Sequence, residues 1–466
     1  MARAPALHAG GRGFESHILH HFDNYSDLII RVLFCLALLN KIIYNTNQLR
    51  GDDMSILERF LKYVSISTTS NSFEIKTPTS KGQTELAKLL VNELNDLNLD
   101  EIYYDDENCY VYGVLRGNSE LPKIGFISHL DTSEDANGEN IKPCILNNYN
   151  GKNVKLNNGI IISIEDYPDL KNHMGKTLIT SDGTTLLGAD DKAGIAEIME
   201  MLQYFCNTNE EHGDIYICFT PDEEIGLGTS NFEQKYFKPD FAYTVDGGGL
   251  GEFSYENFNA ATATININGV STHCGTAKDK MINAGRVAAI INSLLPEEMP
   301  ENTDGYEGFF HLDKINGNVS NATLKYLIRD FDKDNFEKRK QIISNIVLEL
   351  NKKYNNCIEL TITDTYYNMF DIINKESDLI KGTLNAMKQI GVEPNIIPIR
   401  GGTDGTDISY MGIPCPNLGT GGHNFHSVYE YICLEDMEKS SEILISIVKQ
   451  FCKNYNENNI KVNKKY

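Results

Sequence analysis

The sequence predicts an α/β protein in which a mixed, mostly parallel sheet carries helices on both faces and a smaller α+β domain is inserted. Short apolar strands alternate with amphipathic helices on both sides of the insertion, which is typical of a parallel sheet. Residues 259–368 follow the β-α-β-β-α-β order of ferredoxin-like domains. The chain has 466 residues, 41% of them hydrophobic, so it can form two or three domains with sizeable cores.

The first α/β stretch contains two predicted helices and three predicted strands. Residues 83–98 place leucines at the helical period, and a second helix is expected over 192–206 after a glycine-rich approach. Strands are expected at 123–128, 214–220 and 240–245, because each is a short apolar run. Strands and helices that alternate in this way predict parallel neighbours joined by helical connections.

The inserted domain is expected to contain, in order, strand 261–268, helix 282–295, strands near 307–313 and 322–331, helix 334–354 and strand 358–366. The α/β pattern then resumes and closes with an amphipathic helix at about 435–452. The predicted division is therefore an N-terminal extension at 1–53, a main domain in two parts at 54–258 and 369–466, and the inserted domain at 259–368.

The first 53 residues differ in composition from the rest of the chain. They carry five acidic and five basic residues and four of the ten arginines, whereas the later chain uses mainly lysine. We expect that the start is mis-assigned and that the true one is Met54. The apolar run at 28–39 is shorter than the about 20 residues that span a bilayer, and Arg31 interrupts it. A membrane anchor is the alternative, which mass spectrometry of the native N-terminus distinguishes.

The charge and the cysteines restrict the class of protein. Acidic residues outnumber basic ones by 65 to 42, and the formal net charge of −23 comes entirely from Met54 onward. This balance argues against nucleic acid as a partner and fits cations or small molecules. The ten cysteines are scattered without a CxxC pair, so free thiols are expected rather than disulfides or a thiolate zinc site. The sequence therefore predicts a cytoplasmic protein.

Five polar clusters lie at or near the ends of predicted strands, where open α/β sheets place their functional sites. They are His129-Leu130-Asp131, the runs 188–194 and 221–226, Asp246 with the glycines after it, and the run 421–426 near Glu430. Taken singly, each has an ordinary explanation, such as a helix N-cap or a turn that needs glycine. Together they form a set of histidine and carboxylate ligands suited to zinc, or to manganese or cobalt, in a two-metal site.

The chain resembles the M20 family of di-zinc exopeptidases from about Met54 to about Cys452. The motifs SHLDTSEDA, LLGADDKAG, PDEEIG, VDGGG, RGGTDG and NFHSVYE occur in the family's order, with a long spacer at 141–187 and the inserted domain in its place. Residues 1–53 fall outside the resemblance. The resemblance implies a zinc-exopeptidase-like catalytic domain and assigns the inserted domain as a lid and dimerisation domain.

The resemblance also implies the roles of individual residues. Two Zn²⁺ ions per subunit, with Co²⁺ or Mn²⁺ as substitutes, would have as their ligands His129, Asp190, Glu224, Asp246 and His426. Glu223 is similar to the general base. Asp131 is similar to the carboxylate that orients His129, and Asp191 follows the bridging Asp190 through a bond that is typically strained. His423 lies off the family's ligand position.

Substrate-binding roles are implied for four further residues, His273, Asn318, Arg329 and Arg400. His273 resembles the lid histidine that reaches across a homodimer to stabilise the oxyanion. Arg329 and Arg400 carry guanidinium groups that could bind the substrate's terminal carboxylate through two hydrogen bonds. An ion pair with Asp330 or Asp332 is the alternative for Arg329.

The function implied by the resemblance is an aminopeptidase that releases the N-terminal residue from tripeptides. Two alternatives remain open. The chain could be another M20 hydrolase, namely a dipeptidase, a carboxypeptidase or an amidohydrolase of N-acyl amino acids. It could also be a non-catalytic metal-binding scaffold, although such a protein has no need of Glu223 beside Glu224. Short peptides are the expected partners, without nucleic acid or membrane.

Overall fold

A computed structural model describes residues 54–373 and 377–463. The predictions for residues 1–53, including the apolar run at 28–39, lie outside these ranges. None of the helices in the described ranges combines the length and the apolar character that crossing a membrane requires.

The largest sheet has eight strands in the order β1-β2-β8-β3-β9-β16-β10-β15. The pairs β8–β3, β3–β9, β9–β16 and β10–β15 are parallel, whereas β1–β2, β2–β8 and β16–β10 are antiparallel. The predicted mixed, mostly parallel sheet is therefore confirmed. In chain order the strands are β1 (Glu101–Asp105), β2 (Tyr110–Leu115), β3 (Ile124–His129), β8 (Ile215–Thr220), β9 (Phe241–Gly247), β10 (Glu252–Ser254), β15 (Asn395–Ile396) and β16 (Asn417–Gly419).

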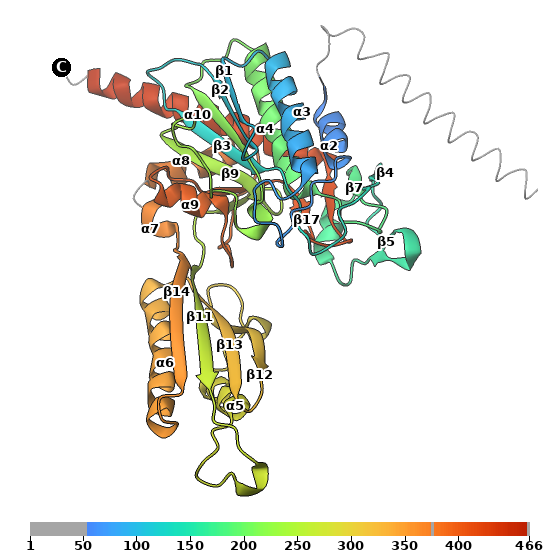
Figure 1. Cartoon of the computed structure of the whole chain (residues 1–466). Coiled ribbons are helices and arrows are strands. Elements are labelled where there is room, and N and C mark those ends of the chain that lie inside the picture. Colours follow the sequence, from blue (N-terminus) through green and yellow to red (C-terminus); the bar gives the residue numbers. More distant parts are fainter. Residues whose placement is uncertain (1–53, 374–376, 464–466) are drawn as a thin grey trace, which may run out of the picture. The chain divides into compact units, whose positions relative to one another are not determined.

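Both faces of this sheet are buried. Successive side chains of a strand point to opposite faces, so a strand buried along its length contributes to a core on each face. In β2, Val111 belongs to the larger core, whereas Tyr110 and Tyr112 belong to a second core on the other face. On the first face α4 packs on β3 and β9, and α10 packs on α4 and α8 (Figure 1). The helices are α2 (Ile56–Val64), α3 (Lys81–Asp96), α4 (Ala189–Asn207), α7 (Phe370–Ile373), α8 (Ser377–Gln389), α9 (Asp404–Tyr410) and α10 (Leu434–Asn463).

A small antiparallel sheet, not predicted from the sequence, has the order β17-β18-β7-β4. Its strands are two or three residues long: β4 (Cys144–Leu146), β7 (Leu178–Thr180), β17 (Gly422–His423) and β18 (Tyr431–Cys433). Strands β4 and β7 lie in the long spacer at 141–187. The hairpin of β5 (Val154–Lys155) and β6 (Ile161–Ile162) lies in that spacer too. The 3₁₀ helices of the described residues are η1 (Asn157–Gly159), η2 (Pro168–His173), η3 (Glu223–Ile225), η4 (Cys274–Thr276) and η5 (Pro300–Asn302).

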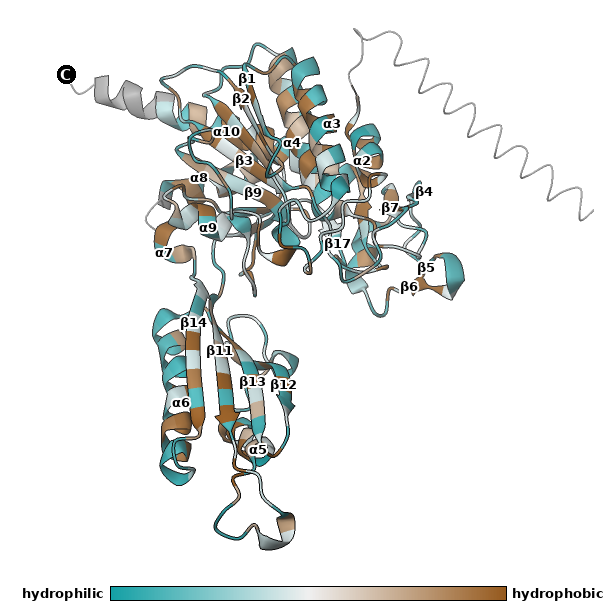
Figure 2. Ribbon diagram, viewed as in Figure 1, coloured by the Kyte–Doolittle hydropathy of each residue, from teal (hydrophilic) through white to brown (hydrophobic). Residues whose placement is uncertain are grey.

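The inserted segment forms a four-stranded antiparallel sheet in the order β12-β13-β11-β14, with its own hydrophobic core. This is the ferredoxin-like order that the sequence predicts. Hydrophobic and hydrophilic residues alternate along its strands (Figure 2), because one face packs on the two helices. The elements are β11 (Asn259–Asn268), α5 (Ala284–Leu294), β12 (Phe309–Gly317), β13 (Asn321–Asp330), α6 (Lys333–Lys353) and β14 (Ile358–Tyr366). The residue limits of the domains stay a prediction.

Candidate metal centre

The candidate centre lies at the carboxyl ends of three neighbouring parallel strands. Strand β3 ends at His129, which pairs in register with Thr220 at the end of β8. The turn after β8 carries Glu223 and Glu224, and β9 carries Asp246 near its own end. Because parallel strands deliver their carboxyl ends to one edge of a sheet, these side chains converge there.

Two groups of side chains with donor atoms for a metal share Asp190, at the start of α4. In the first group, His129 Nε2 lies 2.9 Å from Asp190 Oδ1 and 3.4 Å from Asp246 Oδ1. In the second, His426 Nε2 lies 3.1 Å from Asp190 Oδ2 and 3.0 Å from Glu224 Oε2. The two oxygens of Asp190 therefore face different histidines, which is the placement that a bridging carboxylate requires.

Asp131 links the histidine of the first group to the turn after β8. Its Oδ1 lies 3.3 Å from His129 Nδ1, the ring nitrogen that faces away from Asp190. The same carboxylate accepts hydrogen bonds from the backbone N–H groups of Glu223, at 3.0 Å, and Glu224, at 3.2 Å. Asp131 is fully buried, so it positions three side chains of the centre from behind.

Two further acids hold the segment around Asp190. Glu430 accepts backbone hydrogen bonds from Leu187, Gly188 and Asp190, at 2.6, 2.8 and 3.1 Å. The peptide bond between Asp190 and Asp191 is cis. The Asp191 carboxylate accepts hydrogen bonds from the Ser128 hydroxyl and from the backbone N–H of His129, so it ties α4 to the end of β3.

Glu430 and Asp404 are two further acids near the centre whose roles are not apparent from the sequence. Both are buried: Glu430 holds the loop before α4, and Asp404 accepts a hydrogen bond of 2.8 Å from the Thr220 hydroxyl at the end of β8. Burial raises the pKa of each carboxyl to about 7. Asp404 lies in the motif RGGTDG and Glu430 in the motif NFHSVYE. The presence of an acid inside each motif was the sequence feature that could have identified them.

The pKa values of the central carboxyl groups differ because burial, charges and histidines act on them unequally. Burial raises the pKa of Asp246 to about 6 and that of Glu224 to about 7. Burial acts on Asp190 too, but hydrogen bonds to two histidines outweigh it and hold its pKa below the usual range. Burial and then the charge of Asp246 raise the pKa of Glu223 well above its usual value. When cations bind among these four carboxyl groups, they stabilise the charged form of each group.

The donor atoms fit a pair of divalent metal ions. Each group offers an imidazole nitrogen and carboxylate oxygens, a combination that zinc, manganese and cobalt accept. Within each group the three donor atoms lie within 4.8 Å of one another. The buried Oε1 of Glu224 has no hydrogen-bond partner among the described residues, so it can bind a cation. The structure thus brings together all five residues that the resemblance implies as ligands.

Replacing Asp131 by asparagine is expected to weaken metal binding by about 10- to 100-fold, because the side chain that orients His129 loses its charge. The amide oxygen can still accept one hydrogen bond, but the NH₂ group would face the N–H of Glu223 or Glu224. Titration of the metal-free protein with zinc measures the affinity. Glu134→Gln, an exposed and equally isosteric change three residues away, is the control. Equal affinities of the two variants would contradict the orienting role.

The candidate substrate residues of the inserted domain make local contacts. His273 Nδ1 accepts the backbone N–H of Gly275, and Asn318 Oδ1 accepts those of Ser320 and Asn321 in the turn between β12 and β13. Arg329 Nη1 donates to two backbone carbonyls, and its guanidinium lies over the Tyr366 ring. The alternative for Arg329 was an ion pair with Asp330 or Asp332, but in the described residues Asp330 pairs with Arg339 at 2.7 Å and Asp332 accepts the backbone N–H of Asn335 at 2.8 Å.

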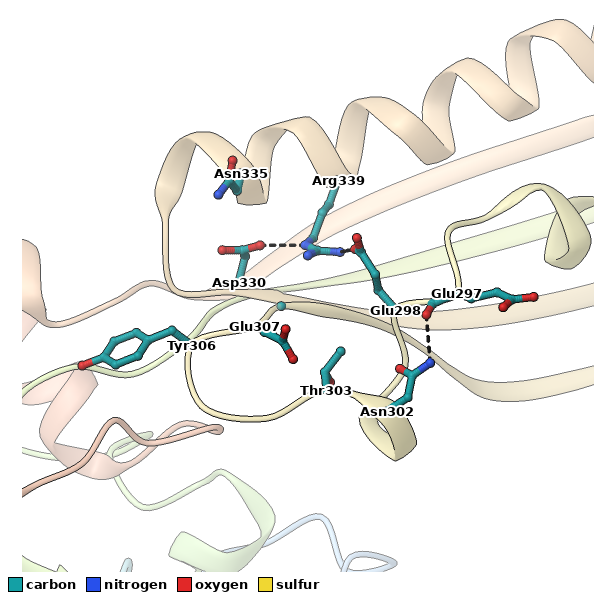
Figure 3. Close-up of a pocket in the computed structure, with 10 residues that line it drawn as sticks. Glu297, Glu298, Asn302, Thr303, Tyr306, Glu307, Asp330, Asn335 and Arg339 are labelled. Atoms are coloured by element: carbon teal, nitrogen blue, oxygen red, sulfur yellow. Dashed lines mark hydrogen bonds and ion pairs between the residues drawn. The ribbon is translucent and has the colours of Figure 1, made fainter.

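Arg400 already uses its guanidinium to hold the loop around η5. Its nitrogens donate to the carbonyls of Thr303, Gly305 and Glu307, at 3.3, 2.8 and 2.9 Å. The same loop borders a pocket of about 290 Å³ in which Arg339 bridges Asp330 and Glu298 (Figure 3). None of the candidate metal ligands lines this pocket, which is therefore distinct from the metal centre.

His423, which lies off the family's ligand position, packs against two rings of the neighbouring elements. Its ring stacks on Tyr431 at a centroid distance of 4.9 Å and meets the edge of His173 at the same distance. Burial and then the neighbouring His173 lower the pKa of His423 to about 4. It belongs to the small sheet rather than to either group around Asp190.

Comparison with known proteins identifies the family. The model of the peptidase family M20/M25/M40 matches residues 182–450. Peptidase T of Caldanaerobacter subterraneus subsp. tengcongensis is 50% identical over 405 residues, which cover 85% of this chain and 99% of that protein. Peptidase T of Alkaliphilus oremlandii is 49% identical over 408 residues, covering 86% and 100%.

Solved structures show the same fold at low sequence identity. The aminopeptidase PepT from Bacillus cereus superposes with a TM-score of 0.68 at 22% identity, over 85% of this chain and 98% of that one. The YXEP protein of Bacillus subtilis, described as a dinuclear metal-binding peptidase, gives a TM-score of 0.57 at 13% identity, over 85% and 99%. With its match to the family and its identity to curated members, this chain belongs to the peptidase family M20/M25/M40.

Proposed function

We propose that this peptidase is a metallo-aminopeptidase that releases the N-terminal residue from tripeptides, with two zinc ions at the centre around Asp190. The observation that carries the proposal is the sharing of Asp190 by two complete groups of donor atoms. Relatives named peptidase T, at about 50% identity over nearly their whole length, support the substrate class. The reducing compartment predicted from the cysteines supports a cytoplasmic enzyme.

Each group of the centre is assigned one ion. His129 and Asp246 would hold the first, Glu224 and His426 would hold the second, and Asp190 would bridge them. When bound there, two divalent cations would supply Lewis-acid polarisation of the scissile carbonyl and would lower the pKa of the attacking water. The protein's own contribution is to fix the two groups at strand ends that the sheet holds rigidly.

Glu223 is proposed as the general base. Its half-buried carboxyl lies within electrostatic reach of Asp246, His129 and Glu224, where a carboxylate can accept a proton and return it. In this scheme it takes a proton from the attacking water and then donates it to the leaving amine nitrogen. Asp131 accepts a hydrogen bond of 3.0 Å from the backbone N–H of Glu223, which would keep the Glu223 carboxylate beside the cations.

Substrate binding is assigned to the inserted domain and to Arg400. We place His273 at the oxyanion of a neighbouring subunit, which requires a homodimer formed through the inserted domain, and sedimentation of the active enzyme tests that assembly. Asn318, Arg329 and Arg400 are the candidates for binding the peptide itself. For Arg400 this role requires the guanidinium to exchange its loop carbonyls for the substrate's carboxylate.

A matched series of peptides tests the proposal. Zinc-loaded protein is incubated with di-, tri- and tetrapeptides of one sequence, with the N-acetylated tripeptide, and with N-acyl amino acids. We expect release of the N-terminal residue from the free tripeptide alone. Release from the C-terminus indicates a carboxypeptidase, cleavage of the dipeptide a dipeptidase, and cleavage of N-acyl amino acids an amidohydrolase. Bound metal without any cleavage indicates a scaffold.

A further inference from the structure

A second set of metal-binding side chains lies in the small sheet, outside the centre around Asp190. His173 ends η2, Cys433 ends β18 and Asp436 lies in the first turn of α10. One donor atom from each lies within 4.8 Å of the other two. The residues are 6%, 0% and 2% exposed, so this is an interior cluster. Single residues from three distant elements form it, which is why a search for paired cysteines in the sequence does not find it.

Two polar atoms of the cluster have no hydrogen bond among the described residues. His173 Nδ1 and Asp436 Oδ2 approach to 3.1 Å, yet the pair does not have the geometry of a hydrogen bond. The other oxygen of Asp436 accepts a hydrogen bond from the Lys176 ammonium. The buried imidazole and carboxylate therefore face each other at ion-pair distance without a directed hydrogen bond, and both atoms have lone pairs that a cation can bind.

We propose that His173, Cys433 and Asp436 bind one further divalent ion of the zinc class. Imidazole, thiolate and carboxylate together are typical zinc ligands. Donor atoms on a tetrahedral zinc lie about 3.4 Å apart, and His173 Nδ1 and Asp436 Oδ2 are 3.1 Å apart, close to that separation. Lys176 would support the carboxylate from behind, as hydrogen-bond partners of metal ligands commonly do.

The charges around the cluster are compatible with this ion. Lys176 and His173 are the basic groups against Asp436, and Glu435 accepts the backbone N–H of Thr177 rather than pointing at the cluster. His423 contacts His173 through ring edges and stacks on Tyr431, so it is not a ligand. Burial raises the pKa of the Cys433 thiol, and an incoming metal ion displaces the thiol proton on binding.

The ion would act on structure rather than on catalysis. It would join η2 to the end of β18 and the start of α10, where Cys433 already pairs in register with Leu178 of β7. Strand β18 follows directly on the loop that carries His426, whose ring faces Asp190. A cross-link at this point would hold the base of that loop. The inference concerns a separate site and does not depend on the proposed tripeptidase activity.

Cobalt distinguishes this site from the centre around Asp190. A Co²⁺ ion bound by thiolate has a sulfur-to-metal charge-transfer band in the near ultraviolet, and none of the candidate ligands around Asp190 is a cysteine. We expect the band in the metal-stripped full-length protein after loading with Co²⁺. Cys433→Ser should lose the band and bind one equivalent fewer than the wild type. Cys415→Ser, a control at a buried thiol of a different core, should keep both.

Absence of the band from the wild type, or a band that persists in Cys433→Ser, would overturn the proposal. If Cys433→Ser does not fold, His173→Gln takes its place, because it keeps the thiol and removes only the nitrogen ligand. That variant should bind the ion more weakly and show the band only at higher Co²⁺ concentration. An unchanged Co²⁺ titration of His173→Gln would also overturn the assignment.

Discussion

Replacing Glu223 by glutamine is expected to lower kcat by about 10²- to 10⁴-fold while the protein keeps its full metal content. Glutamine has the size of glutamate but cannot accept a proton from water or return it to the leaving amine. The backbone hydrogen bond from residue 223 to Asp131 survives, because the substitution leaves the main chain unchanged. Turnover of the tripeptide and the zinc content of the same preparation are the two measurements.

The neighbouring acid provides the comparison. Glu224→Gln removes a carboxylate that faces His426, so it should lose metal as well as activity. Glu233→Gln, the same change in a side chain paired with Lys235, should alter neither. Turnover close to wild type in Glu223→Gln would remove Glu223 from the base role. Loss of metal from that variant would instead place Glu223 among the ligands.

Much of the fold is predictable because its elements carry their periodicity in consecutive residues. The strand expected at 358–366 is β14 with the same bounds, and the helix expected at 334–354 is α6, which is displaced by one residue. Helix α10 continues to Asn463, beyond the expected end at 452. His129 stands out for the same local reason, since a polar residue that ends a buried apolar strand lies at the edge where ligands bind.

The small sheet and the meeting of distant residues are not predictable in this way. Strands β7 and β18 are three residues long, too short to show a period, and they pair Thr180 with Tyr431. His426 reaches Asp190 only because this pairing brings its loop back to the start of α4. The resemblance to a family identified His426 as a candidate ligand, whereas periodicity alone could not identify it. The positioning role of Glu430, which depends on three backbone N–H groups, likewise appears only in the fold.

Replacing Asp190 by asparagine is expected to remove both metal ions and nearly all activity. One oxygen of Asp190 faces His129 and the other faces His426, and an amide has only one oxygen to offer. The affinity for both ions should fall by more than the about 100-fold upper limit expected for Asp131→Asn. Metal content after gel filtration and a zinc titration of the metal-free protein measure this loss.

Variants of the unshared ligands give the comparison that isolates bridging. Asp246→Asn removes a ligand of the His129 group alone, and Glu224→Gln removes one of the His426 group alone, so each should keep one equivalent of metal. Asp166→Asn changes an exposed carboxylate that bonds the Ser163 hydroxyl and should keep both, which controls for the lost charge. If Asp190→Asn also kept one equivalent, Asp190 would serve a single ion. Only a shared carboxylate predicts that one substitution empties two sites whose other ligands are intact.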